Sequence, residues 1–160
     1  MMKNKKGFTL TELLAVIVLL GLLSTAAITG LMSVRRNSNR KLAEKLENTL
    51  TQVGDEIYPY ESVQESSAFM NAYDGLGENQ NIKITLSELR KSGFLKNLVK
   101  VDGEYKLVSP ANNKETCDGF IIITKVGGAP VSKGYIKCND LYTTTGFDSV
   151  SSVDTPELSE

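Results

Sequence analysis

Two residue types are missing from this chain of 160 residues, which has no histidine and no tryptophan. Without histidine there is no Ser-His or Cys-His nucleophile, and no zinc site can use imidazole ligands. Neither sign of charge dominates, because 18 Lys and Arg stand against 19 Asp and Glu. This balance argues against a general nucleic-acid binder, which would be basic. Because no motif for an active site or cofactor is present, we expect no enzyme and no cofactor.

Acidic residues are also missing from the apolar run 8–34, with the exception of Glu12. The run is long enough to cross the hydrocarbon core of a bilayer as a helix. A short leader, residues 1–7, precedes it and carries three lysines before Gly7. A carboxylate near a membrane is costly, so such a residue usually has a partner and a function. Glu12 follows Phe8 by one helical turn, which places both on one face.

The sequence Lys-Gly-Phe-Thr-Leu-Thr-Glu at residues 6–12, followed by the apolar run, resembles the processing signal of type IV prepilins and pseudopilins. The resemblance covers about residues 1–35, and the rest of the chain is similar to the family only loosely. It implies cleavage between Gly7 and Phe8 by a prepilin peptidase, with N-methylation of Phe8 by the same enzyme. It further implies that Glu12 pairs with the free amine of a neighbouring subunit during assembly.

These implications describe a structural subunit of a type IV pilus or pseudopilus. The expected partners are further copies of the chain, the prepilin peptidase, the membrane, and the assembly platform with its ATPase; nucleic acid is expected only for a competence pilin. The expected location is the cytoplasmic membrane, crossed once with the N-terminus in the cytoplasm, and then a cell-surface filament. Adhesion or motility, DNA uptake and type II-like secretion remain open. The alternative is a membrane-anchored extracellular binding module that does not polymerise.

Hydrophobic periodicity predicts an α+β, pilin-like fold in which one long N-terminal helix packs on a small antiparallel sheet. Leu42, Leu46, Leu50 and Val53 define the helix face that should meet the sheet, and Pro59 should end the helix near Tyr58. The expected organisation is a leader at 1–7, a transmembrane and assembly helix at 8–34, an amphipathic continuation at 35–58, a globular head at 59–142 and a flexible tail at 143–160.

A hairpin is the clearest signal in the C-terminal third. The pair Gly127-Gly128 separates two strand-like runs, and a two-residue turn there sets the residues on either side opposite one another. Counting back along both runs brings Cys117 opposite Cys138, which predicts a disulfide across the hairpin; free thiols are the alternative. A disulfide closing a loop of this length stabilises by about 3 kcal/mol in the chain-entropy model.

The turn-rich stretch 74–81 contains four oxygen-bearing side chains, which are Asp74, Glu78, Asn79 and Asn81. Oxygen ligands suit Ca²⁺, but the spacing is not that of an EF-hand loop. A solvated loop is therefore the main interpretation, and a calcium site is the weaker alternative.

Overall fold

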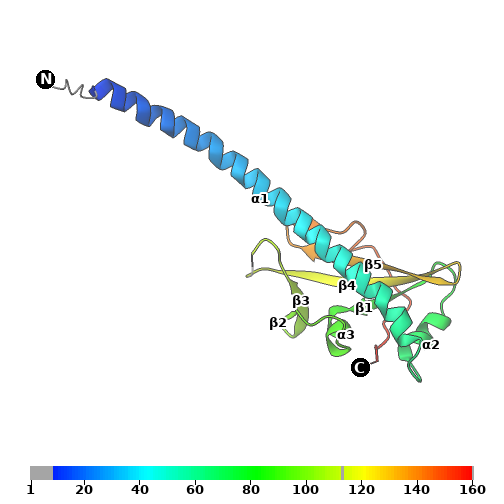
Figure 1. Ribbon diagram of the computed structural model, residues 1–160. Helices are drawn as coiled ribbons and strands as arrows, with labels where there is room; N and C mark the ends of the chain where they lie inside the picture. Colours follow the sequence, from blue (N-terminus) through cyan, green and yellow to red (C-terminus); the bar gives the residue numbers. More distant parts are fainter. Residues whose placement is uncertain (1–8, 113, 160) are drawn as a thin grey trace, which may run out of the picture. The chain divides into compact units, whose positions relative to one another are not determined.

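A computed structural model describes residues 9–112 and 114–159, apart from the side chains of residues 23–30. The chain divides into two compact units, Met1–Ser38 and Asn39–Glu160. The long helix α1, Leu10–Glu61, contributes to both units. The remaining helices and strands belong to the second unit, called the head below, so the α+β fold class is confirmed (Figure 1).

The head contains two short helices and, within the described residues, six strands. The elements after α1 are α2 (Ala68–Asp74), β1 (Asn81–Thr85), α3 (Leu86–Lys91), β2 (Val99–Val101), β3 (Glu104–Val108), β4 (Thr116–Val126), β5 (Ala129–Cys138) and β6 (Tyr142–Thr143).

Strand β4 is the centre of the sheet. One edge of β4 pairs antiparallel with β5 along nearly its whole length, and β6 follows β5. The other edge pairs with two strands in turn, β3 near the start of β4 and β1 further along. Strand β2 completes the sheet beside β3. Strand β4 therefore has neighbouring strands on both edges, and its isoleucines supply much of the core.

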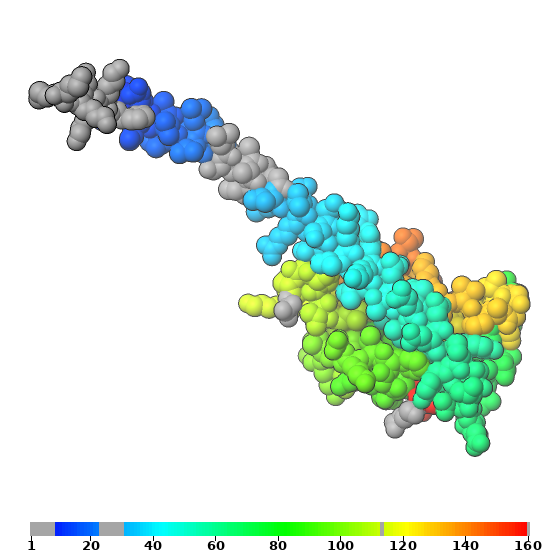
Figure 2. Space-filling view, viewed as in Figure 1, coloured from blue at the N-terminus to red at the C-terminus, as the bar shows by residue number. Residues whose placement is uncertain are grey.

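The C-terminal part of α1 covers one face of this sheet (Figure 2). Ala43, Leu50 and Ile57 are buried at seven-residue spacing, whereas Leu42 remains 46% exposed. The predicted face was therefore correct at Leu46, Leu50 and Val53, which are in the main core or pack against it, and wrong at Leu42. Gly54, on the helix face that packs on the sheet, has no side chain and lets α1 approach the sheet closely.

Two glycines set the close approach of helix and sheet. A Cβ atom on Gly54 would lie 2.7 Å from Cβ of Ser132, and one on Gly134 would lie 2.5 Å from the carbonyl oxygen of Glu47. At the same place the Gly134 N–H donates to Oγ1 of Thr51 at 2.9 Å. The helix therefore contacts the backbone of β5 directly, and Gly134 cannot be enlarged without moving one of them.

The second face of the sheet carries a smaller cluster. Phe120, Ile122 and Tyr135 are buried there, and Phe147 and Val150 from the segment after β6 pack on them. The ring of Phe120 stacks on that of Tyr135 with centroids 5.1 Å apart. The head thus has a main core under α1 and a minor one on the opposite face.

The segment predicted as a flexible tail, 143–160, makes defined contacts over its described residues. The Lys83 N–H donates to the Asp154 carbonyl at 3.0 Å, so the tail runs beside β1. Leu158 is buried in the main core, and the Ser159 N–H donates to Oε1 of Glu61 at 2.8 Å. The composition of the tail is polar, but Phe147, Val150 and Leu158 pack on the two cores, and backbone hydrogen bonds join the tail to β1.

The helix α1 ends three residues later than the sequence predicted, at Glu61. Pro59 lies inside the last turn instead of ending the helix at Tyr58, since a helix loses only one hydrogen bond to proline there. The cap of the following helix is Ser67, whose Oγ accepts from the Met70 N–H at 3.1 Å. Thr85 caps α3, because its Oγ1 accepts from the Glu88 N–H at 3.2 Å.

Candidate functional site at the amino-terminal helix

The start of α1 is closed by a reciprocal pair of hydrogen bonds. Oε2 of Glu12 accepts from the backbone N–H of Thr9 at 2.9 Å and from its Oγ1 at 2.8 Å, while the Glu12 N–H donates to Thr9 Oγ1 at 3.3 Å. This is a capping box, which supplies partners for the unpaired N–H groups of a helix start. Gly7 and Phe8 lie outside the described residues, so the structure does not place the predicted cleavage point.

The first unit presents apolar side chains to its surroundings. All described side chains of α1 from Leu10 to Leu22 and from Leu31 to Val34 are exposed, among them many large aliphatic ones. Among the helices, as far as the structure describes them, none reaches both the length and the apolar character needed to cross a membrane. The predicted span 8–34 includes residue 8 and residues 23–30, which fall outside the described residues or side chains.

The hairpin of β4 and β5 has the register that its turn implied. Val126 pairs with Ala129 across Gly127–Gly128, which both have positive φ, and Cys117 and Cys138 form a disulfide. The same register sets Asp118 opposite Lys137. Asp118 forms its ion pair with Lys106 and Lys137 with Asp148.

A polar contact that the sequence did not reveal joins α1 to the end of the sheet. The hydroxyls of Tyr142 and Thr144 each donate to Oε2 of Glu47 at 2.6 Å, and the Ile136 N–H donates to Thr144 Oγ1 at 3.0 Å. The neighbours of Glu47 in the sequence are Glu44, Lys45 and Asn48, which is typical of a helix surface that faces solvent. Its partners are almost a hundred residues away, and no local signal could have found them.

Because of the Tyr142–Glu47 hydrogen bond, the folding stability of the head should fall at high pH. Desolvation and the bond to Glu47 raise the pKa of Tyr142 to about 12. An unfolded tyrosine ionises near pH 10, so between pH 10 and 12 the unfolded state loses this proton first and folding stability falls. We expect Tyr142→Phe to be less stable than wild type by about 1 kcal/mol at pH 8. The difference should shrink as the pH rises towards 11.5.

Urea unfolding at each pH, followed by near-ultraviolet circular dichroism, measures this difference. Tyr105→Phe is the matched control because no hydrogen bond is found for that hydroxyl among the described residues. A difference between wild type and Tyr142→Phe that stays constant from pH 8 to 11.5 would contradict the assignment.

The loop between α2 and β1 holds a cation of the chain itself. Nζ of Lys125 donates to the carbonyl oxygens of Tyr73, Asp74 and Leu76 at 3.4, 3.3 and 3.2 Å. Of the calcium candidates, Asp74 therefore contributes a carbonyl oxygen to this ammonium. Three converging carbonyl oxygens are a typical environment for a cation, and here the cation is the ammonium group of Lys125.

The other calcium candidates serve the hairpin. A Glu78 carboxylate oxygen accepts from the Gly127 N–H, and the Asn79 N–H donates to the Lys125 carbonyl at 2.8 Å. Asn81 is the first residue of β1 and pairs with Thr124 of β4. In the part of the chain that the structure describes, no three His, Cys, Asp or Glu side chains gather to hold a metal ion.

We expect millimolar CaCl₂ to leave the urea midpoint of the head unchanged relative to EGTA, because the Lys125 ammonium already occupies these carbonyl oxygens. Lys125→Met should destabilise the head by about 1 kcal/mol through the loss of charge-assisted hydrogen bonds. Lys96→Met, at an exposed position, is the control and should stay near wild type. Stabilisation of the wild-type protein by Ca²⁺ would show that the loop binds the ion after all.

Comparison with known proteins gives one finding about the amino-terminal segment. The family model described as the prokaryotic N-terminal methylation motif matches residues 2–28. No curated protein and no solved structure matches the chain. The match includes Gly7, Phe8 and Glu12, the residues singled out by sequence pattern. Residues 2–28 therefore carry the prepilin-type signal of type IV pilins and pseudopilins.

Proposed function

We propose that this protein is a structural subunit of a type IV pilus or pseudopilus, cut by a prepilin peptidase and polymerised through α1. The observation that carries the proposal is the prepilin-type signal at residues 2–28, which leads into a helix that continues into an α+β head. The proposal covers pili for adhesion or motility, competence pili for DNA uptake and secretion pseudopili. Only the competence role would add nucleic acid as a partner.

The exposed apolar side chains of α1 support this function. A single copy in water would leave them hydrated, which costs roughly 25 cal/mol per Å² of apolar surface. The membrane covers them before assembly, and the helices of other copies cover them afterwards. The free energy of moving from lipid to filament is then set by packing and polar pairing, because lipid and helix bundle bury the same apolar surface.

Glu12 provides the polar pairing in this mechanism. Cleavage after Gly7 frees the amine of Phe8, which is positively charged. In a dry helix bundle, neither this amine nor the Glu12 carboxylate is solvated, so each is stabilised by the opposite charge on a neighbouring copy. Within one copy Thr9 holds the Glu12 carboxylate at the N-terminal end of α1, and this supports the proposed pairing.

The test is expression of the chain with an active or an inactivated prepilin peptidase, followed by electron microscopy with an antibody to the head. We expect labelled surface filaments only with the active peptidase. A chain that stays in the membrane as single copies under both conditions would favour the anchored binding module. Labelled filaments with the inactive peptidase would overturn the proposed processing.

A further inference from the structure

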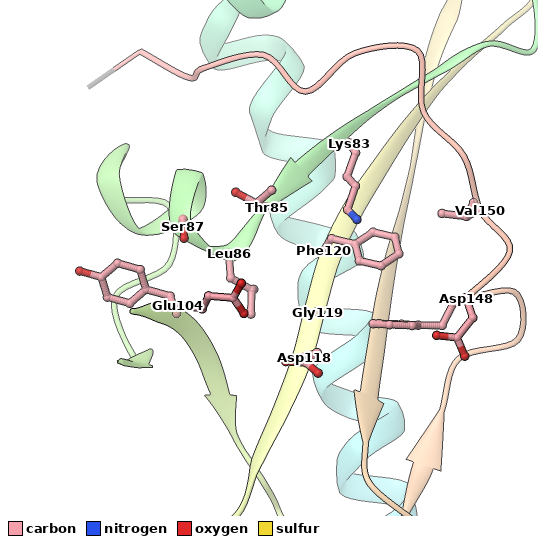
Figure 3. Close-up of a pocket in the computed structure, with 12 residues that line it drawn as sticks. Lys83, Thr85, Leu86, Ser87, Glu104, Asp118, Gly119, Phe120, Asp148 and Val150 are labelled. Atoms are coloured by element: carbon pink, nitrogen blue, oxygen red, sulfur yellow. The ribbon is translucent and has the colours of Figure 1, made fainter. Parts of the chain in front are cut away.

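A hollow of about 500 Å³ lies on the sheet beside β1, β4 and the segment after β6 (Figure 3). The Lys83 ammonium in it lies 4.1 Å from the centre of the Phe120 ring. Asp118 and Asp148, which also line it, each form an ion pair with a lysine of the same copy. The charged groups named here are thus already engaged within one copy.

A second hollow, called the groove below, lies between α1 and the segment that begins at the end of β3. It measures about 330 Å³, and its lining is mainly apolar, with Leu42 and Leu46 on one side and Val108 and Pro110 on the other. Leu42 is the side chain that the sequence predicted to meet the sheet, and it stays 46% exposed. Covering such apolar surface is favourable, so the groove is suited to receive a few apolar side chains.

The loop that follows α1 presents the complementary surface, and its residues 62–65 are called the tip below. Val63 is 77% exposed, more than any other large apolar side chain described in the head, and Figure 2 shows this segment projecting at the lower right. The base of the tip is fixed, because the buried Glu61 accepts from Oγ of Ser67 and from the Ser159 N–H. A projecting side chain on a fixed base loses little conformational freedom on binding.

The groove and the tip also carry opposite charges. Lys45 lines the groove and Glu65 belongs to the tip; both are exposed, and neither forms an ion pair within the described residues. The exposed Val131, by contrast, lies two residues from the exposed Lys133, which would repel Lys45. Among these exposed apolar side chains, Val63 therefore has the charge beside it that suits the groove.

The two surfaces lie at different ends of the part of α1 that belongs to the head. From Lys45 to the end of the helix at Glu61 the distance is roughly 24 Å, at about 1.5 Å per residue. A contact between two different surfaces repeats from copy to copy and builds an open filament, whereas a symmetric contact closes on itself. The proposed pairing of Phe8 with Glu12 shifts neighbours by only about one helical turn, so the tip reaches a copy several steps further along.

We propose that the tip of one copy inserts Val63 into the groove of a second copy, where Glu65 pairs with Lys45. This interface rests on the proposed function, because it joins copies within the filament. It adds a contact between heads to the contact between the amino-terminal parts of α1.

The first test is a cysteine cross-link in filaments sheared from cells with an active prepilin peptidase. Thr49→Cys, in the lining of the groove, is combined with Val63→Cys, while the native cysteines are already joined to each other. After mild oxidation we expect a ladder of covalent multimers on a non-reducing gel. The matched control combines Asn48→Cys with Val63→Cys, because Asn48 is exposed and next to Thr49 but outside the groove lining. No ladder from the first pair, or the same ladder from the control, would overturn the proposal.

Charge reversal is the second test, and it separates this contact from filament formation as such. Lys45→Glu and Glu65→Lys should each lower the amount of surface filament about tenfold, because like charges then meet in the interface. The double variant should assemble like wild type. Single variants that assemble like wild type, or a double variant no better than the singles, would overturn the contact and leave the filament proposal standing. A wild-type chain without filaments would overturn the proposed function, and this contact with it.

Discussion

Replacing Glu12 with glutamine is expected to reduce filaments at the cell surface at least tenfold while the chain still accumulates in the membrane. Glutamine at this position can still accept the hydrogen bonds of Thr9, so the start of α1 keeps its cap. Only the negative charge is lost. Removing one member of a poorly solvated ion pair costs about 3–5 kcal/mol, because the other charge is left without compensation.

Two further variants separate the charge from the cap. Thr9→Val removes the hydroxyl of the capping box and leaves the charge of Glu12, so filaments should persist at close to wild-type amounts. Glu44→Gln removes an exposed charge of the same helix, where the partner is Arg40 within one copy. Immunoblots of sheared and membrane fractions give the assembled share. Wild-type filaments from Glu12→Gln would show that the carboxylate acts only as a cap.

Gly134→Ala is expected to destabilise the head by about 3 kcal/mol, near the upper end of the usual cost of overpacking. The added Cβ would lie 2.5 Å from the Glu47 carbonyl oxygen, 2.6 Å from Cβ of Leu50 and 2.9 Å from the Thr51 nitrogen. All three atoms are fixed by the backbone of α1, so no side-chain rotation relieves the contact. The helix must move off the sheet, and the hydrogen bond from Gly134 to Thr51 weakens with it.

Urea unfolding measured by the tyrosine signal in near-ultraviolet circular dichroism tests this effect, because all tyrosines lie in the head. Gly75→Ala is the control. Gly75 has a φ of −71°, and its new Cβ would meet atoms no closer than 3.5 Å. If Gly134→Ala were as stable as Gly75→Ala, the close contact of α1 with β5 would be wrong.

The sequence predicted best where one local rule determines the structure. The Gly127-Gly128 turn fixes the register of β4 and β5, and counting from it placed Cys117 opposite Cys138. Gly7, Phe8 and Glu12, in register with the apolar run that follows, identified the prepilin-type signal. These features depend on neighbours in the chain, which is why pattern alone found them.

The sequence predicted worst where distant segments meet. Of the four apolar residues expected to meet the sheet, only Leu42 stays exposed. The closest contacts between α1 and the sheet are at Gly54 of α1 and Gly134 of β5, which no hydrophobic pattern marks. The carboxylate of Glu47 accepts from donors in β6 and the residue after it, which its charged neighbours in α1 do not indicate. The polar tail was taken as flexible, although Leu158 enters the core. Each error concerns a contact that no window of the sequence contains.

The measurement that tests the filament account most directly is the mass of the N-terminal peptide, taken from sheared surface material and from membranes of the same cells. We predict that both fractions contain a peptide that begins at Phe8, and that the surface fraction carries a methyl group on its amine. A peptide that still begins at Met1, in cells whose prepilin peptidase is active, would contradict the account.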